Sequence, residues 1–327
     1  MKQLSPWTAA LLKRCATLVA GNGGNSLLVL VFHRVLPKPD PLLNEDPDVA
    51  DFAAQMDVVR ATCTVLPLAE AVDRLYQYSL PPNAACITFD DGYANNLTCA
   101  APVLQEKGLP ATVFVTTGFL EGGRMWNDTV IESVRGAGEE LDLASLGLGR
   151  FALPDIPARR HASQSLRRKL KYLDPEERAQ KTSKIAEIVG CDLPQGLMLS
   201  ESQVKQLVRM GIEVGAHTVS HPILARVDDL SARREILESK ATLEEVTGAP
   251  VGLFAYPNGQ PQRDYLRRHV EMVREAGFSA AVSHAWGACH PGSDRFQLPR
   301  MKPWETSRVG FVGRLIYTRR ARREQTA

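Results

Sequence analysis

Short runs of consecutive apolar residues recur along the chain, and stretches with helical spacing of apolar residues lie between them. The runs lack the apolar–polar alternation of strands that expose one face to water. Strands that are apolar at every position are typical of parallel sheets covered on both faces. The predicted strands are Leu27–Phe32, Cys86–Phe89, Ala111–Val115, Ile212–Ala216, Val251–Ala255 and Ser279–Val282.

Helices are predicted between these strands from apolar spacing and from capping residues. Ser200 and Gln203 have the spacing of a capping box, and Ser231 is the expected first cap of a long helix ended by Gly248. Repeated strand–helix order in a chain of this length predicts an α/β fold, a distorted (β/α) barrel forming one domain over residues 1–327. Further helices are expected at Phe52–Arg60, Leu68–Tyr78 and Asp264–Ala276.

One segment, residues 120–197, interrupts the strand–helix order. It shows no clear strand, is rich in arginine and lysine, and has a helical stretch around Leu166–Val189. We interpret it as a mainly helical insertion after the strand that ends at Val115. Two roles stay open for it: a lid over the functional site or a peripheral addition, since long insertions often carry function.

The two ends of the chain carry weaker patterns. Apolar residues of the first twenty positions fit an amphipathic helix, which either packs on the barrel or touches a membrane surface. Residues 315–327 are interpreted as a basic, solvated tail. No apolar stretch reaches the ~20 residues of a membrane span, and no convincing signal peptide precedes the barrel. We therefore expect a cytoplasmic protein, with peripheral membrane contact through the termini as the alternative.

Composition excludes some classes of function. The formal charge of +2 is too small to indicate binding of nucleic acid. The six cysteines form no C-x-x-C pair and no disulfide framework, which fits reduced thiols.

Polar residues come directly after the predicted strands, at their carboxyl ends, where barrels of this class build active sites. Polar residues scattered over a surface would not recur at the carboxyl ends of the strands. The residues are His33; Asp90, Asp91, Gly92 and Tyr93; His217 and His221; Tyr256, Pro257 and Asn258; and His284.

His217 and His221 are the first metal-ligand candidates. Histidines at i and i+4 face the same way on a helical turn and can bind one ion. Asp91 supplies a third ligand, and such a set suits Zn²⁺, Co²⁺, Ni²⁺ or Fe²⁺. Three protein ligands leave a position open for water and substrate. The alternative is a pair of surface histidines on a loop.

Asp90 and Asp91 are adjacent and leave a strand in different directions. We therefore expect the two carboxylates to have different roles. One carboxylate ligates the metal while the other takes a proton from water made acidic by the metal. Gly92 permits a tight turn at this point. A turn with only capping duties is the alternative.

These residues resemble a known family. Thr88–Gly92 (TFDDG) and His217–His221 (HTVSH) are similar to the first two motifs of the NodB-homology polysaccharide deacetylases, carbohydrate esterase family four. The resemblance runs from about Leu28 to about Pro303 outside the insertion. It implies a NodB-type barrel with Asp90 as base and with Asp91, His217 and His221 as metal ligands. It also implies that the N–H of Tyr93 stabilises the tetrahedral oxyanion.

The later motifs of the family depart from the usual pattern. Phe254–Gly259 (FAYPNG) stands where the family has a Pro–aromatic pair preceded by an arginine, and no arginine lies close upstream. The usual carboxyl-terminal Leu-x-x-His is absent. Val31–Val35 (VFHRV) instead resembles the amino-terminal Tyr-His-x-Val segment of a rearranged branch, which implies His33 as the acid. Arg300 is the candidate to replace the missing arginine beside Asp90.

Other side chains are candidates for the substrate cleft. Tyr93, Tyr256, Pro257 and Asn258 are expected to contact substrate, and Trp126 to stack on a sugar ring, as Trp304 also could. His284, Trp286 and His290 are further candidates to line the cleft. His161 and His269 are expected at the surface.

The sequence therefore predicts a metal-dependent hydrolase with zinc as the first choice of metal. Its expected reaction is removal of the acetyl group from an N-acetylated sugar or glycan precursor. O-acetyl ester hydrolysis or cleavage of another C–N amide is the nearest alternative, because the same tetrahedral chemistry serves both. A non-haem iron oxygenase and an inactive sugar-binding module are the alternatives from other classes. The basic insertion suits an acidic or phosphate-bearing substrate.

Overall fold

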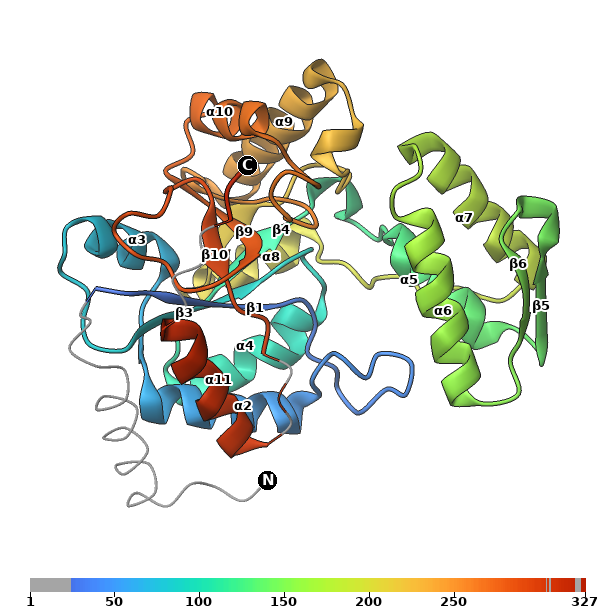
Figure 1. The fold of residues 1–327 in the computed structure, drawn as a ribbon, viewed down its shortest axis with the longest axis horizontal. Helices are drawn as coiled ribbons and strands as arrows, with labels where there is room; N and C mark the ends of the chain where they lie inside the picture. The colour runs from blue at the N-terminus through green and yellow to red at the C-terminus, as the bar shows by residue number, and fades with distance from the viewer. Residues whose placement is uncertain (1–24, 304, 306, 321–324) are drawn as a thin grey trace.

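A parallel sheet forms the centre of the molecule (Figure 1). The computed structural model describes residues 25–303, 305, 307–320 and 325–327. Within them, the main sheet has the order β1-β3-β4-β7-β8-β9-β10, with the short β2 (Thr64–Val65) beside β3. All these pairings are parallel, as the apolar runs predicted. The strands are β1 (Leu28–Phe32), β3 (Ala84–Phe89), β4 (Thr112–Val115), β7 (Glu213–Ala216), β8 (Leu253–Ala255), β9 (Ala280–Trp286) and β10 (Leu298–Arg300).

The last strand closes the sheet into a nearly complete barrel. Met301, directly after β10, bridges to Leu30 of β1. The N–H of Val31 donates to the carbonyl of Met301 at 3.0 Å, and the N–H of Met301 donates to Val29 at 2.8 Å. The predicted (β/α) barrel is confirmed. Strand β10 was not predicted, because three residues that include Pro299 give too short an apolar run.

Helices surround the sheet, and their ends show which capping predictions were right. Ser200 and Gln203 form the predicted capping box of α8. Helix α9 begins two residues before Ser231, because the carboxylate of Asp228 caps it; Gly248 ends it with a left-handed φ of 68°. The helices of the barrel are α2 (Val49–Thr62), α3 (Leu68–Tyr76), α4 (Ala101–Lys107), α8 (Glu201–Arg209), α9 (Asp229–Thr247), α10 (Arg267–Glu275) and α11 (Arg308–Arg320).

The insertion forms a lobe beside the barrel, which we define as residues 126–189 (Figure 1). Its helices are α5 (Trp126–Gly136), α6 (Ile156–Leu170) and α7 (Pro175–Val189). The lobe has a hydrophobic core of its own, which includes Val134, Leu166 and Ile185.

The expectation that the insertion contains no strand is wrong. Strands β5 (Glu140–Leu143) and β6 (Gly149–Ala152) form an antiparallel hairpin. Each has four residues and alternates in exposure, so neither produced an apolar run. The expected single helical stretch is two helices, because Asp174 caps a new helix that starts at Pro175.

The chain termini differ from expectation in one respect. The predicted amphipathic helix of the first twenty residues lies outside the described residues. The predicted tail from residue 315 is helical up to Arg320, and Arg319 donates to the carbonyl of Ala84. None of the described helices has the length and apolar character to cross a bilayer.

The separate core of the lobe predicts that two isoleucines of α7 differ in their contribution to stability. Ile185 is fully buried in that core, whereas Ile188 is 47% exposed. We expect Ile185→Ala to lower the free energy of unfolding by about 2–5 kcal/mol through the cavity it leaves. Ile188→Ala, the matched control, is expected to stay within about 0.5–1 kcal/mol. Urea unfolding with amide exchange of the lobe measures both, and equal losses would contradict a separate lobe core.

Candidate active site

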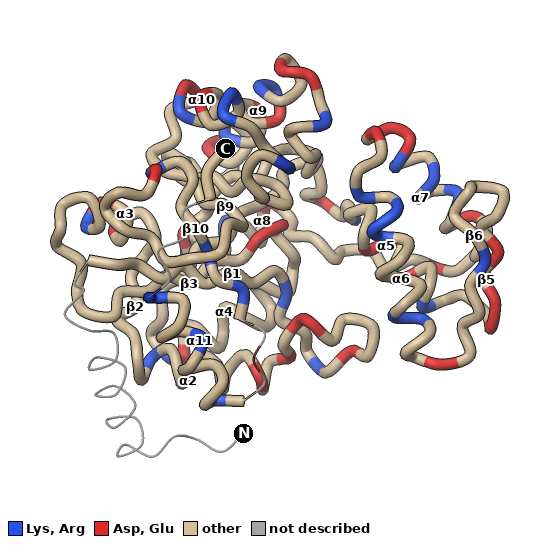
Figure 2. Tube along the Cα trace, viewed as in Figure 1, with Lys and Arg blue, Asp and Glu red and all other residues tan. Residues whose placement is uncertain are grey.

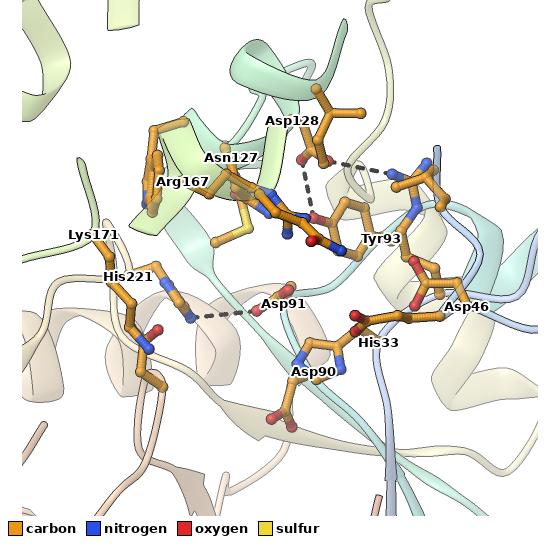
Figure 3. A pocket seen from close by; sticks show the side chains of 18 of the residues that line it. His33, Asp46, Asp90, Asp91, Tyr93, Asn127, Asp128, Arg167, Lys171 and His221 are labelled. Carbon is orange, nitrogen blue, oxygen red and sulfur yellow. Dashed lines mark hydrogen bonds and ion pairs between the residues drawn. The ribbon is translucent and has the colours of Figure 1, made fainter. Parts of the chain in front are cut away.

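Residues at or shortly after the carboxyl ends of β1, β3, β7, β8 and β9 line a cavity of about 560 Å³. That volume lies within the range of about 300–1,000 Å³ typical of small-molecule sites. Figure 3 shows side chains of this cavity from close by. The structure brings together the polar residues that the sequence placed after the strands. His33, Asp90, Asp91, His217, His221, Asn258 and His284 all line this cavity.

Several of these residues adopt backbone conformations that side chains other than glycine rarely take. Asp91, His221 and Asn258 have φ angles of 73°, 57° and 59°. Residues in this left-handed region cost free energy and persist only where their surroundings hold them. Gly92, at φ 81°, also packs so closely that an added Cβ would lie 3.1 Å from Val115. Among the described residues, four of the nine non-glycine residues with positive φ lie in the loops that line the cavity: Asp91, His221, Asn258 and Thr218.

The segment His217–His221 is a loop and not the helical turn expected from its i, i+4 spacing. Thr218, at φ 67°, reverses the chain between the two histidines, and its hydroxyl accepts from the N–H of His221. Glu235 of α9 accepts from the N–H groups of Val219 and Ser220, each at 2.8 Å. The two histidines therefore converge because a distant carboxylate holds the loop, and Glu235 was not predicted from the sequence.

His217 and His221 both point at one carboxylate oxygen. The Nε2 atoms of the two rings lie 3.4 Å from Oδ1 of Asp91. Nδ1 of His217 lies 2.7 Å from the carbonyl of Ala255, which can only accept, so this nitrogen carries the hydrogen. Nε2 is then the nitrogen that faces Asp91, in the way that such a bond orients a histidine in metal sites.

The electrostatics of this group suit a divalent cation. Burial opposes the charge of Asp91, but the bond to His217 and the nearby histidines outweigh it and lower its pKa to about 2. Burial lowers the pKa of His221 to about 3, which leaves a neutral imidazole. Asp91 and the two histidines thus offer an anionic oxygen and imidazole nitrogens, the donor set of zinc and related ions.

Asp90 forms a second cluster beside the first. Its two oxygens accept a bidentate pair of hydrogen bonds from Arg300, each 2.7 Å long, and both side chains are buried. Nε2 of His284 lies 3.2 Å from Oδ2 of Asp90, and the rings of His33 and His284 stack at 5.7 Å. Arg300 thus occupies the predicted position beside Asp90. His284, which we expected only to line the cleft, belongs to the same cluster as Asp90.

Arg300 sets the charge state of Asp90. Burial alone would raise the pKa of this carboxyl, but the guanidinium and the bond to His284 hold it well below its usual range. Burial, with the positive charge of Arg300, lowers the pKa of His284 to about 4. The cluster therefore contains an ionised carboxylate and a neutral imidazole at neutral pH.

Asp128 of α5 connects the lobe to the loops after β1 and β3. Its oxygens contact Arg34 at 3.2 Å and the hydroxyl of Tyr93 at 3.0 Å. Arg34 also lies over the ring of Tyr93, 4.6 Å from its centroid. Burial raises the pKa of Asp128 to about 7 against these interactions. No sequence pattern indicated this role, because Asp128 lies in the insertion, far along the chain from its partners.

Tyr93 lines the same cavity. The next amide, that of Ala94, donates to Leu197 at 2.8 Å. By contrast, within the described residues, the N–H of Tyr93 donates to no backbone carbonyl. It is therefore available to a bound molecule.

The remaining predicted contacts divide into two groups. Asn258 and Trp126 line the cavity, and Arg178 covers one face of Trp126 at 5.2 Å. Tyr256 and Pro257 do not line it: Tyr256 is fully buried, stacked 3.9 Å from Tyr265. Those two expected substrate contacts are thus part of the barrel's interior.

The remaining histidine and tryptophan candidates differ in where their side chains lie. His161 is exposed as expected, but His269 is buried in α10, where Nδ1 accepts from the N–H of Leu266. Trp286 stacks on Tyr317 of α11 rather than facing the cavity, and Trp304 lies outside the described residues.

The barrel thus carries a His–His–Asp group next to an aspartate that is paired with a buried arginine. The chain belongs to the polysaccharide deacetylase family, whose model matches residues 77–281. Members of this family are hydrolases that act on carbon–nitrogen bonds, not oxygenases.

Individual relatives are distant in sequence. A putative polysaccharide deacetylase of Bacillus subtilis, YxkH, is 19% identical over 68% of this chain and 52% of its own length. The chain thus spans about half the length of this curated relative. The deacetylase PplD of Streptococcus pyogenes, solved in complex with acetate, has a TM-score of 0.60 at 16% identity, covering 90% of this chain and 99% of that one. IcaB of Ammonifex degensii has a TM-score of 0.58 at 22% identity, covering 90% and 98%. These structures share the fold of this chain.

The His–His–Asp group predicts that divalent metal stabilises the protein. With zinc at about 100 times its dissociation constant, the free energy of unfolding is expected to rise by about 2.7 kcal/mol. Asp91→Asn and His221→Ala should abolish most of this gain, because each removes a ligand. His161→Ala, which changes an exposed histidine, is the control. Thermal unfolding with and without chelator measures the effect, and full stabilisation of the Asp91 variant would rule out this site.

The buried Arg300–Asp90 pair predicts a large and pH-dependent loss in Arg300→Met. The variant leaves Asp90 buried without its cation, which is expected to cost about 3–5 kcal/mol at neutral pH. Because the pKa of Asp90 rises once the guanidinium is gone, the carboxyl takes up a proton as the pH falls. The deficit should therefore shrink toward acid pH.

The matched control for this variant is Arg234→Met, which breaks a solvent-exposed pair with Glu238. It is expected to cost much less than the loss of the buried pair, because water screens an exposed one. Urea unfolding of chelated protein, near neutral pH and at about pH 5, gives both quantities. A deficit in Arg300→Met that grows as the pH falls would contradict the assigned charge state of Asp90.

Proposed function

We propose that this chain is a divalent-metal-dependent N-deacetylase, which hydrolyses the acetamide of an acetylated amino sugar to acetate and a free amine. The observation that carries the proposal is the pairing of two clusters in one cavity. Asp91, His217 and His221 form the first, and His33, Asp90 and His284 form the second. In each, the potential ligand or proton-carrying atoms lie within 4.8 Å of one another.

The first cluster would hold the metal, and zinc is the ion we propose from its nitrogen and oxygen donors. When bound, such an ion acidifies water and polarises a carbonyl group. Asp91 would contribute the negative charge, and the two imidazoles would contribute nitrogen lone pairs.

The second cluster would move the protons. Asp90 takes a proton from the attacking water, and Arg300 keeps this carboxylate ionised and fixed in orientation. The water oxygen forms the new bond to the acetyl carbon, and the carbon–nitrogen bond breaks. His33 donates a proton to the leaving nitrogen, so that the products are acetate and an amine. The free N–H of Tyr93 would stabilise the negative oxygen of the tetrahedral intermediate.

The two proposed proton carriers predict distinct defects. Asp90→Asn and His33→Gln are each expected to lower the rate of acetate release by about 10²–10⁴-fold, the usual contribution of a general base or acid. Both variants should still bind zinc, since neither residue is a ligand. His161→Gln is the control and should keep the rate of the unchanged protein.

Acetate release is measured on N-acetylglucosamine oligomers and on O-acetylated sugars, with metal content measured in parallel. Release only from O-acetyl groups would replace the proposed reaction by ester hydrolysis. Full activity of Asp90→Asn on N-acetyl groups would remove Asp90 as the base.

A further inference from the structure

The lobe contributes one wall of the cavity. Gln164, Arg167 and Arg168 of α6 line it, as does Lys171, the residue next after the end of that helix. We call Arg167, Arg168 and Lys171 the basic wall. On the opposite face of α6, Leu166 and Leu170 are fully buried in the lobe core and fix the orientation of the helix. Figure 2 shows basic positions along α6 where the lobe faces the barrel.

The side chains of the basic wall are not neutralised by ion pairs within the described part of the chain. Among the described residues, none of its three side chains forms a salt bridge. Most other charges of the cavity are balanced, in the pairs Arg300–Asp90, Arg34–Asp128 and Lys302–Glu45. Two acids of the cavity have no lysine or arginine partner in the described chain. Asp91 faces the two histidines, and Asp46 lies with His33 on the side of the cavity away from Lys171 (Figure 3). The excess positive charge is therefore confined to the lobe side.

The position of these three cations near the end of a helix does not by itself explain why they are grouped. Cations in the last turn of a helix do interact favourably with its dipole. However, Arg167 and Lys171 are four residues apart on one face, where like charges repel. Nε of Arg167 is also buried without a hydrogen-bond partner in the described structure. A buried, unpaired donor on a charged group costs free energy, which an anion in the cavity would recover.

We propose that the basic wall binds a phosphate group carried by the acetylated sugar. Two guanidinium groups match the oxygens of phosphate in bidentate geometry. Three positive charges also suit a phosphate, with a charge of about −1.5 to −2, better than a single carboxylate. This inference rests on the proposed deacetylation and narrows its substrate class. The acetamide lies at Asp90 and Asp91, while the phosphate lies against α6.

The experiment compares zinc-loaded protein on N-acetylglucosamine, N-acetylglucosamine 1-phosphate, a nucleoside-diphosphate-linked N-acetylglucosamine and a polyprenyl-phosphate-linked one. The ratio of kcat/KM for phosphorylated over neutral sugar is the quantity of interest. We expect it to exceed about tenfold in the unchanged protein and to fall about tenfold in Arg167→Gln and in Lys171→Gln, since each removes one charge-assisted contact. Arg150→Gln, which removes an exposed arginine of β6 in the same lobe, should leave the ratio unchanged.

Binding without turnover separates this inference from the proposed function. Calorimetric titration of Asp90→Asn with N-acetylglucosamine 1-phosphate should show binding that weakens when Arg167→Gln is added. If no sugar releases acetate, the proposed function fails, and the titration alone decides whether the wall binds phosphate. Equal kcat/KM for neutral and phosphorylated sugars, or a preference for a carboxylate-bearing sugar, would overturn the wall as a phosphate site. The nucleotide and polyprenyl arms show which phosphate-bearing sugar is preferred.

Discussion

The buried ion pair between Arg300 and Asp90 is the interaction on which the site and the closure of the barrel both depend. Arg300 is the last residue of β10, and Asp90 comes directly after β3, on the far side of β1. Nε of Arg300 also donates to the carbonyl of Ser283 in β9 at 2.8 Å. One guanidinium therefore joins two strands to the proposed base, and the final strand cannot shift without disturbing that base.

A buried ion pair is a poor source of stability, because removing two charges from water costs several kcal/mol for each ion. That cost is recovered only when all the hydrogen bonds of the pair form, and here the guanidinium reaches Asp90, Ser283 and Thr88. Such a pair enforces one geometry at a low net gain. That property suits a carboxylate that must stay ionised and aimed while it is enclosed by apolar strands.

The fold and the central residues could be predicted because both depend on strand phase. An apolar run gives a strand, and parallel strands bring the residues at their carboxyl ends to one end of the barrel. His33, Asp90, Asp91 and the two loop histidines were therefore found together. The same reasoning failed at Tyr256, whose ring turns back into the core to stack on Tyr265. A residue that follows the carboxyl end of a strand can point either into the cavity or into the core, and its position in the sequence does not determine which.

The contacts between distant segments could not be predicted. Glu235 supports the loop of His217 through amides 15 and 16 positions away, and Asp128 reaches Arg34 across 94 positions. No local pattern in the sequence encodes either contact. The strained backbone at Asp91 and His221 is a consequence of such support, since each φ is tolerated only because other groups hold the loop.

The molecule divides its tasks between two bodies with separate cores. The barrel carries the proposed acid, base and metal ligands on segments at or after the carboxyl ends of its strands. The lobe supplies a charged wall from a helix anchored in its own core, and Asp128 of the lobe contacts Arg34 and Tyr93 in the loops after β1 and β3. Side chains on the cavity face of α6 are thus free to change without disturbing the barrel. The fold does not require the charge of that face, which is why we attribute it to the substrate.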